Sequence, residues 1–222
     1  MAQEGYSVTN GADPEKTARL SREEKRAVTR ERLLESGAAV FAERGFYGAS
    51  VEEIAERAGF TRGAFYSNFE SKADLFLAIL DGHIERDTRA LEEALGDGTQ
   101  SNAFLNLIQR QSQRRSEARQ WTLLWAEFWL HVMRHPELAP KLAARQQAVR
   151  SAIARLVERQ CSALGFAPPI PADQLAAVML AVDDGLKLQE DLDPAAIPED
   201  LRVRMLVLLF NGMAAMGRAP GA

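Results

Sequence analysis

The side chains best suited to contact DNA lie together in residues 61–69, whose sequence is TRGAFYSNF. Arg62 carries a guanidinium that can donate to base edges, and Tyr66 lies four residues later on the same face of a helix. Phe65 and Phe69 are also four apart, on another face, and are predicted to point at the core. The hydroxyls of the stretch can donate to phosphates, and its small residues let the backbone approach a duplex. A short helix that enters a groove of DNA is therefore predicted.

Two short helices joined by a tight turn are predicted to position this surface. Ser50 and Glu53 have the spacing of a capping box at the start of the first helix. Gly59 is predicted to end that helix, because glycine adopts the left-handed conformation without steric cost. Thr61 is predicted to cap the second helix. Together the two helices form a helix-turn-helix pattern.

Composition is that of an ordinary soluble globular protein, with 222 residues of which 46% are hydrophobic and 26% charged. The net charge of −4 counts against a DNA-binding protein. Residues 16–32, however, hold seven lysines and arginines against three glutamates. Phosphates respond to such a local patch, because charges farther than about 10 Å are largely screened.

Cysteine usage and hydropathy indicate the compartment. Cys161 is the only cysteine, which fits a reducing cytosol. The first twenty residues contain no apolar segment typical of a signal peptide, and the longest apolar run, residues 205–210, is too short to span a bilayer. We therefore expect a cytoplasmic protein that does not enter a membrane.

Helical periodicity continues along the whole chain, and no segment alternates convincingly with period two. Ser21 and Glu24 predict a capping box for a first helix over residues 21–44. Gly37 inside this helix costs about 1 kcal/mol relative to alanine, which close packing against another helix would explain. An all-α fold of about nine helices is predicted.

The ordered motifs between residues 33 and 75 resemble the DNA-binding domain of the TetR family of bacterial transcription regulators. The matching pieces are LLESGAAVFAERGF, SVEEIAERAG and TRGAFYSNFESKADLF. The resemblance implies an N-terminal three-helix helix-turn-helix domain followed by a C-terminal helical domain for ligand binding and dimerisation. We expect a disordered arm over residues 1–20, the DNA-binding domain over 21–80, and the effector-binding and dimerisation domain over 81–222.

The resemblance also adds Lys72 to the predicted DNA contacts. A cation in the first turn of a helix opposes the helix dipole, so an external anion would explain it. In the family, this lysine position contacts a DNA phosphate. The residues predicted to contact DNA are Ser50, Thr61, Arg62, Gly63, Ala64, Tyr66, Ser67, Asn68 and Lys72.

A stripe of three tryptophans, Trp121, Trp125 and Trp129, recurs at i, i+4 and i+8. Such a stripe is either plain core or one wall of a small-molecule pocket, and the resemblance favours the pocket. The predicted ligand-binding residues are Phe104, Ile108, Trp121, Trp125, Phe128, Trp129, Met179 and Asp183. Glu127 and His131, four apart, are either polar handles of this pocket or a surface ion pair. His131 and His135 lack a third metal-binding neighbour, so no metal site is expected.

The last two helices carry more apolar side chains than one domain can bury, which predicts a homodimer formed through them. The predicted function is a ligand-responsive repressor that leaves a palindromic DNA operator when a small, largely apolar or aromatic effector binds. No cofactor and no enzymatic activity are expected. Two alternatives remain: a DNA-binding regulator without an effector, and a helical enzyme, for which the sequence shows no catalytic triad, phosphate-binding glycine loop or metal cluster.

Overall fold

The computed structural model describes residues 21–96, 115–198 and 200–217, and every regular element in these ranges is a helix. In chain order they are α1 (Arg22–Gly48), α2 (Val51–Arg57), α3 (Arg62–Tyr66), α4 (Lys72–Gly96), α6 (Arg115–Arg134), the 3-10 helix η1 (Pro136–Leu138), α7 (Ala139–Ala163), α8 (Ala172–Leu192) and α9 (Leu201–Gly217). The prediction of an all-α fold is confirmed. The predicted arm, residues 1–20, and two predicted pocket residues, Phe104 and Ile108, lie outside the described residues.

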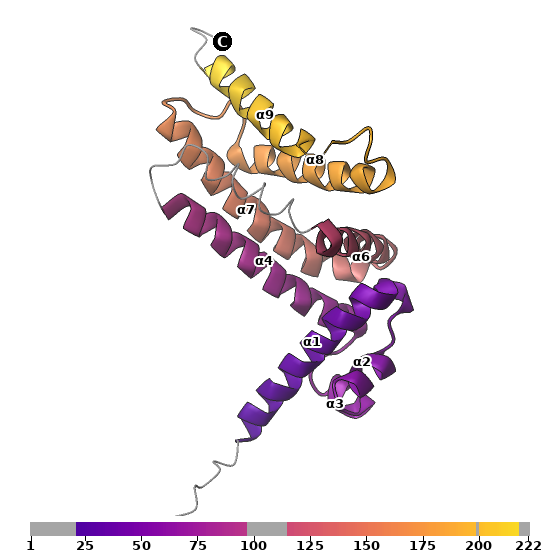
Figure 1. The fold of residues 1–222 in the computed structure, drawn as a ribbon. Coiled ribbons are helices and arrows are strands. Elements are labelled where there is room, and N and C mark those ends of the chain that lie inside the picture. The colour runs from indigo at the N-terminus through magenta and orange to yellow at the C-terminus, as the bar shows by residue number, and fades with distance from the viewer. Residues whose placement is uncertain (1–20, 97–114, 199, 218–222) are drawn as a thin grey trace, which may run out of the picture.

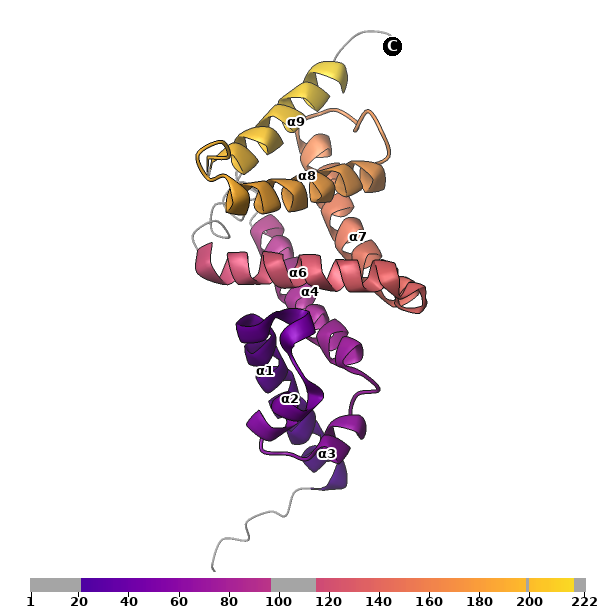
Figure 2. The ribbon, with the colours of Figure 1, turned by 90° about the vertical axis from the view of Figure 1, so that its right-hand side faces the viewer.

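Groups of helices follow one another from one end of the molecule to the other. The group α1–α3 lies at one end of the molecule and α8 and α9 lie at the other (Figure 1). α4 connects the first group to the rest and packs along α7. Figure 2 shows α6 crossing between the α1–α3 group and α8, and α6 packs against both α1 and α8. α6 therefore contacts both ends of the molecule directly, beside the second connection through α4 and α7.

Local sequence signals explain the shape of α1. The Ser21 N–H donates to Glu24 Oε2 at 2.6 Å and Ser21 Oγ accepts from the Glu24 N–H at 3.1 Å, so the predicted capping box is confirmed. Helical geometry breaks at Gly45, whose φ of 71° is a left-handed conformation that favours glycine. A Cβ on Gly37 would lie 2.6 Å from Leu75 Cδ2, which confirms close packing of α1 against α4.

Two hydrophobic cores hold the helices together. The first joins α1–α4 and also includes Leu124, Phe128 and Val132 of α6. The second lies between α7, α8 and α9 and includes Val157, Met179 and Met213. The predicted domain boundary at residue 80 falls inside α4, and the first core extends across it. The division into domains stays a prediction, and a continuous core joins its two parts.

Within the described ranges, no helix combines the length and the apolar character needed to span a membrane.

Candidate nucleic-acid interface and ligand cavity

α3 is short, and its two ends are held by local contacts. Thr61 Oγ1 accepts from the Ala64 N–H at 3.2 Å, as expected of an N-cap. Gly59 before it has a φ of 78°, as predicted for the turn. Phe65 and Phe69 are buried in the first core, which confirms that this face of the helix points inward. The opposite face is therefore the one that solvent, and a duplex, can reach.

The first helix of the pair begins with only half of the predicted capping box. Ser50 Oγ accepts from the Glu53 N–H at 3.1 Å. The Glu53 carboxylate, instead of returning to the Ser50 backbone, pairs with Arg44 Nε at 3.5 Å. Because Ser50 Oγ and Thr61 Oγ1 act as acceptors in these caps, both hydroxyl protons are left to donate elsewhere.

Arg62 and Tyr66 are exposed on the outer face of α3. The Arg62 side chain is 63% exposed, and Tyr66 is 47% exposed. Arg62 Nη1 lies 2.8 Å from Glu52 Oε1 of α2, and its guanidinium lies 5.4 Å from the centre of the Tyr66 ring. The pKa of Arg62 is raised, mainly by its contact with Tyr66 and to a lesser degree by the charge of Glu52. Arg62 therefore presents a permanent positive charge beside a phenol, on the face predicted to read DNA.

The two polar residues that directly follow α3, Ser67 and Asn68, have hydrogen-bond partners inside the protein. Ser67 Oγ donates its proton to Gly63 O at 2.9 Å, and Asn68 Nδ2 donates to Ala64 O at 2.8 Å. In this arrangement Ser67 cannot donate to a phosphate, and it can only accept. A Cβ added to Gly63 would make an ordinary van der Waals contact, 3.7 Å from Thr61 Oγ1. Gly63 is exposed, and the approach of its backbone to DNA stays a prediction.

Two arginines of α1 hold the C-terminal end of α3. Arg26 Nη2 donates to Ser67 O at 3.4 Å, and Arg30 Nη1 donates to Asn68 O at 3.1 Å. The Arg30 guanidinium also lies 4.2 Å from the centre of the Phe69 ring. Sequence reasoning missed this role, because about forty residues separate the partners and no spacing rule connects them. The two arginines therefore connect α1 to the C-terminal end of α3.

Lys72 has internal partners that the sequence did not reveal. Its Nζ donates to Phe46 O at 2.6 Å and to Ala49 O at 2.7 Å, and it lies 4.7 Å from the centre of the Phe46 ring. Burial lowers the pKa of Lys72, and the nearby charge of Glu127 raises it by less. Carbonyls at the end of α1, and not only an external anion, therefore explain the cation in the first turn of α4. Its predicted phosphate contact stays a prediction.

Residues 45–49, which include the two carbonyls bound by Lys72, also contact α6. Glu127 Oε2 accepts from the Phe46 N–H at 2.6 Å, and the Phe46 ring packs 5.1 Å from Phe128 and 4.7 Å from His131. Any Cβ at Gly45 would lie 2.6 Å from Glu127 Oε2. The interpretation of Glu127 and His131 as polar handles of a pocket is wrong, since both contact the end of α1.

A cavity of about 350 Å³ opens between α4, α6, α7 and α8. Trp121, Trp125 and Trp129 all line it, and Trp121 and Trp125 also pack against the first core. The binding of a ligand by this stripe stays a prediction. Its further apolar lining comes mainly from Leu80, Ile84, Val149, Leu180 and Leu188, and its charged lining is Arg145, Asp184 and Lys187. The volume is at the lower end of the range for small-molecule sites.

Three predicted pocket residues lie elsewhere. Phe128 is completely buried in the first core, 4.1 Å from the Phe76 ring. Met179 belongs to the second core. Asp183 pairs with Lys187 at 2.6 Å and is absent from the cavity wall. Successive residues of a helix point about 100° apart, so Phe128 faces the α1 side while Trp129 faces the cavity.

The two histidines near the end of α6, His131 and His135, lie next to each other. The ring centres of His131 and His135 lie 4.0 Å apart with the rings tilted by 32°, and His135 Nδ1 lies 2.8 Å from His131 O. In the part of the chain that the structure describes, no group of three or more His, Cys, Asp or Glu side chains is placed to hold a metal ion.

Two family models match consecutive parts of the chain. The model described as "Bacterial regulatory proteins, tetR family" matches residues 33–79. The model described as "BetI-type transcriptional repressor, C-terminal" matches residues 102–207. The first match contains the helix-turn-helix, and the second contains α6, α7 and α8, which form most of the cavity.

Individual relatives are regulators of transcription and not enzymes. The HTH-type transcriptional activator FasR of Mycolicibacterium smegmatis is 33% identical over 102 residues, which are 42% of this chain and 45% of FasR. The HTH-type transcriptional repressor BepR of Brucella suis is 48% identical over 54 residues, 24% of this chain and 26% of BepR. The matched segments thus span less than half the length of either relative.

Solved structures share the fold over most of the chain. A TetR-family transcriptional regulator from Rhodococcus sp. superposes with a TM-score of 0.69 and 24% sequence identity, covering 84% of this chain and 99% of that one. At this identity the similarity establishes the fold alone. With both family models matching in order, the chain belongs to the TetR family of bacterial regulatory proteins.

Proposed function

We propose that this protein is a DNA-binding transcriptional regulator that reads its operator with α3. The exposed pair Arg62 and Tyr66, on a helix whose other face is buried, is the observation that carries the proposal. A guanidinium can bind the O6 and N7 atoms of guanine, and a phenol can donate to a phosphate. Thr61 and Ser50 add hydroxyl protons at the N-terminal ends of α3 and α2, where phosphate binding is favourable.

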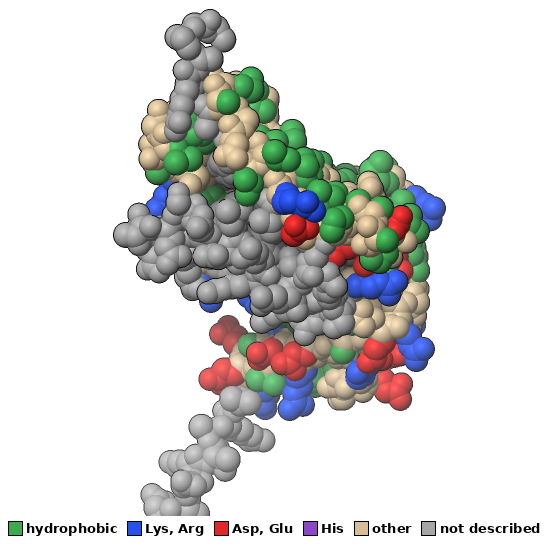
Figure 3. All heavy atoms as spheres, turned by 45° about the horizontal axis from the view of Figure 1, so that its top comes forward, with side chains coloured by type: hydrophobic (Ala, Val, Ile, Leu, Met, Phe, Trp, Pro, Cys, Tyr) green, Lys and Arg blue, Asp and Glu red, His purple; other side chains and the backbone are tan. Residues whose placement is uncertain are grey.

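We also propose that the protein acts as a homodimer joined through α8 and α9. Both helices carry large exposed apolar side chains, namely Val178, Leu188 and Leu192 on α8 and Leu208 and Met216 on α9. Figure 3 shows hydrophobic side chains gathered over the end of the molecule where these helices lie. An isologous pair would bury these side chains, and two copies of α3 would then read two half-sites of a palindrome.

A small effector with a largely apolar or aromatic body is proposed to occupy the tryptophan-lined cavity. α6 contacts different parts of the molecule with two of its faces. Trp125 and Trp129 line the cavity, while Glu127 and Phe128 hold residues 45–49 at the end of α1. An effector that favours a shifted α6 would also shift the α1–α3 group. It can do so only to the extent that it binds the shifted form more tightly.

The mode we propose is repression by the effector-free protein, with release of the operator when the effector binds. The named relatives include both an activator and a repressor, so this choice needs its own test. A regulator without an effector would keep the same DNA interface, and in that case no small molecule would change operator affinity.

The test of the DNA-reading face is fluorescence anisotropy on a selected operator. Arg62→Ala is expected to weaken binding about tenfold or more and to relax preference at one base position. Arg155→Ala is the matched control, since Arg155 is similarly exposed on α7 and pairs with Glu92 at 3.7 Å. Equal affinity of the folded Arg62→Ala protein and the control would remove α3 as the reading helix.

A further inference from the structure

We propose that Arg145 senses an acid group on the ligand, and that this acid group competes with Asp81 for the Arg145 guanidinium. The inference rests on the proposed effector cavity and adds its ligand class: an apolar molecule with one carboxylate or similar anion. A neutral apolar molecule would fill the same cavity without disturbing Arg145.

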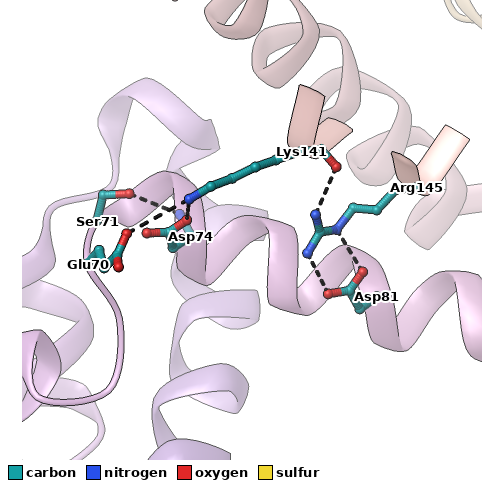
Figure 4. Close-up of polar contacts among 6 residues, drawn as sticks. All are labelled: Glu70, Ser71, Asp74, Asp81, Lys141 and Arg145. Carbon is teal, nitrogen blue, oxygen red and sulfur yellow. Dashed lines mark hydrogen bonds and ion pairs between the residues drawn. The ribbon is translucent and has the colours of Figure 1, made fainter. Parts of the chain in front are cut away.

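Figure 4 shows how Arg145 is held. Its Nε and Nη2 donate to the two carboxylate oxygens of Asp81, each at 2.7 Å, and its Nη1 donates to Lys141 O at 2.9 Å. A guanidinium in this two-pronged geometry matches a carboxylate specifically. Arg145 lines the cavity, and Asp81 is absent from the cavity wall. Arg145 therefore borders the cavity and at the same time pairs with a carboxylate of α4 that does not.

The two partners differ in how much water they contact. The Arg145 side chain is 24% exposed, whereas the Asp81 side chain is 53% exposed. If Asp81 leaves the pair, its carboxylate becomes fully hydrated at small cost. If Arg145 were left unpaired against an apolar wall, the cost would be larger, because a half-buried charge needs a partner. A ligand carboxylate can thus replace Asp81, while its apolar body rests on the tryptophans.

The remaining charged lining favours Arg145 as the anion-binding position. Asp184 and Lys187 carry opposite charges on α8, and the Lys187 ammonium, which pairs with Asp183 at 2.6 Å, is a point charge without the two-pronged donor geometry of a guanidinium. Asp184 would repel an anion placed near it. Arg145, on α7, is the cation of the described lining that presents a two-pronged donor.

Replacing Asp81 would act on the helix that follows the reading helix. Lys141, one turn before Arg145 on α7, lies 2.8 Å from Asp74 and 3.9 Å from Glu70 (Figure 4). Glu70 and Asp74 flank the start of α4, directly after α3. The two cations therefore fasten the first three turns of α4 to α7, and an anionic ligand would undo the second of these attachments.

All three tryptophans of the chain line the cavity, so intrinsic fluorescence reports on it. The experiment titrates octanoate and octan-1-ol, a matched pair that differs in the acid group, into the full-length protein near neutral pH. The quantity compared is selectivity, the dissociation constant of octan-1-ol divided by that of octanoate. The variants are Asp81→Asn, Arg145→Gln and, as control, Arg155→Gln, with folding checked by circular dichroism.

Asp81→Asn removes the competitor, so selectivity for octanoate should rise about tenfold over wild type. Arg145→Gln should lower selectivity about tenfold or more, and Arg155→Gln should leave it unchanged. If Arg145→Gln does not fold, the Asp81→Asn result decides alone. Equal selectivity in wild type and Asp81→Asn would overturn the inference while leaving the cavity in place. Absence of any fluorescence response to either probe would overturn both the inference and the effector site, but not the DNA interface.

Discussion

Glu127→Ala should loosen the contact between α6 and the end of α1. The Glu127 carboxylate accepts from the Phe46 N–H at 2.6 Å, and the Tyr47 N–H lies 3.4 Å from the same oxygen. Hydrogen bonds to a charged group contribute about 1.5–3 kcal/mol, and the partly buried Phe46 N–H would be left without this partner. The free energy of unfolding should therefore fall by about 1.5–3 kcal/mol, which is about 3–12 °C in Tm for a chain of this size.

The assay is urea denaturation at one fixed protein concentration, because dimerisation would otherwise change apparent stability. Glu127→Gln keeps an oxygen acceptor but loses the charge, so its effect should be intermediate. Glu43→Ala is the matched control, because Glu43 also lies 2.7 Å from a donor, Arg57 Nη1, but on the open surface. If Glu127→Ala is no less stable than Glu43→Ala, the claim that the Glu127 carboxylate stabilises residues 45–49 is refuted.

Three further outcomes are expected. Gly37→Ala should reduce the free energy of unfolding by up to about 2 kcal/mol in the same urea assay, because overlap of the new Cβ with Leu75 Cδ2 costs about 1–3 kcal/mol and the higher helix propensity of alanine offsets about 1 kcal/mol; a variant more stable than wild type would mean that α1 and α4 can separate. Burial, and then the charge of Arg86, lower the pKa of His83 from 6.5 to about 4; the unfolded chain binds that proton first, so stability should fall from pH 6.5 to about 4, and His83→Gln should flatten this slope in thermal melts. Arg30→Ala should reduce the free energy of operator binding by more than it reduces the free energy of unfolding, because it frees the end of α3 while leaving the core intact. A larger loss of folding stability than of operator binding would argue against this positioning role.

Features set by neighbouring residues could be predicted from the sequence. The Thr61 cap, the left-handed Gly59 and the inward face with Phe65 and Phe69 all depend on spacings of four residues or fewer. Such contacts exist within a single turn or helix, so the pattern of residue types is enough to place them.

Contacts across the fold could not be predicted in this way. Glu127 lies 81 residues from Phe46, and Arg30 lies 38 residues from Asn68, so only the packing of whole helices brings them together. The cavity illustrates the same limit: the tryptophan stripe was recognisable, but which edge of it faces the cavity depends on how α6 is rotated between two cores. Arg145 carried no sequence signal, because α4 and α7 had first to lie side by side.

The most direct test of the central claim is selection of bound fragments from random DNA by the wild-type protein and by the Arg62→Ala/Tyr66→Ala double variant. We predict that the wild-type protein enriches an inverted repeat with half-site centres about ten base pairs apart or a multiple of that, and that the double variant does not. Absence of any enriched sequence, or enrichment of the same repeat by both proteins, would contradict the claim that α3 reads DNA in a symmetric pair.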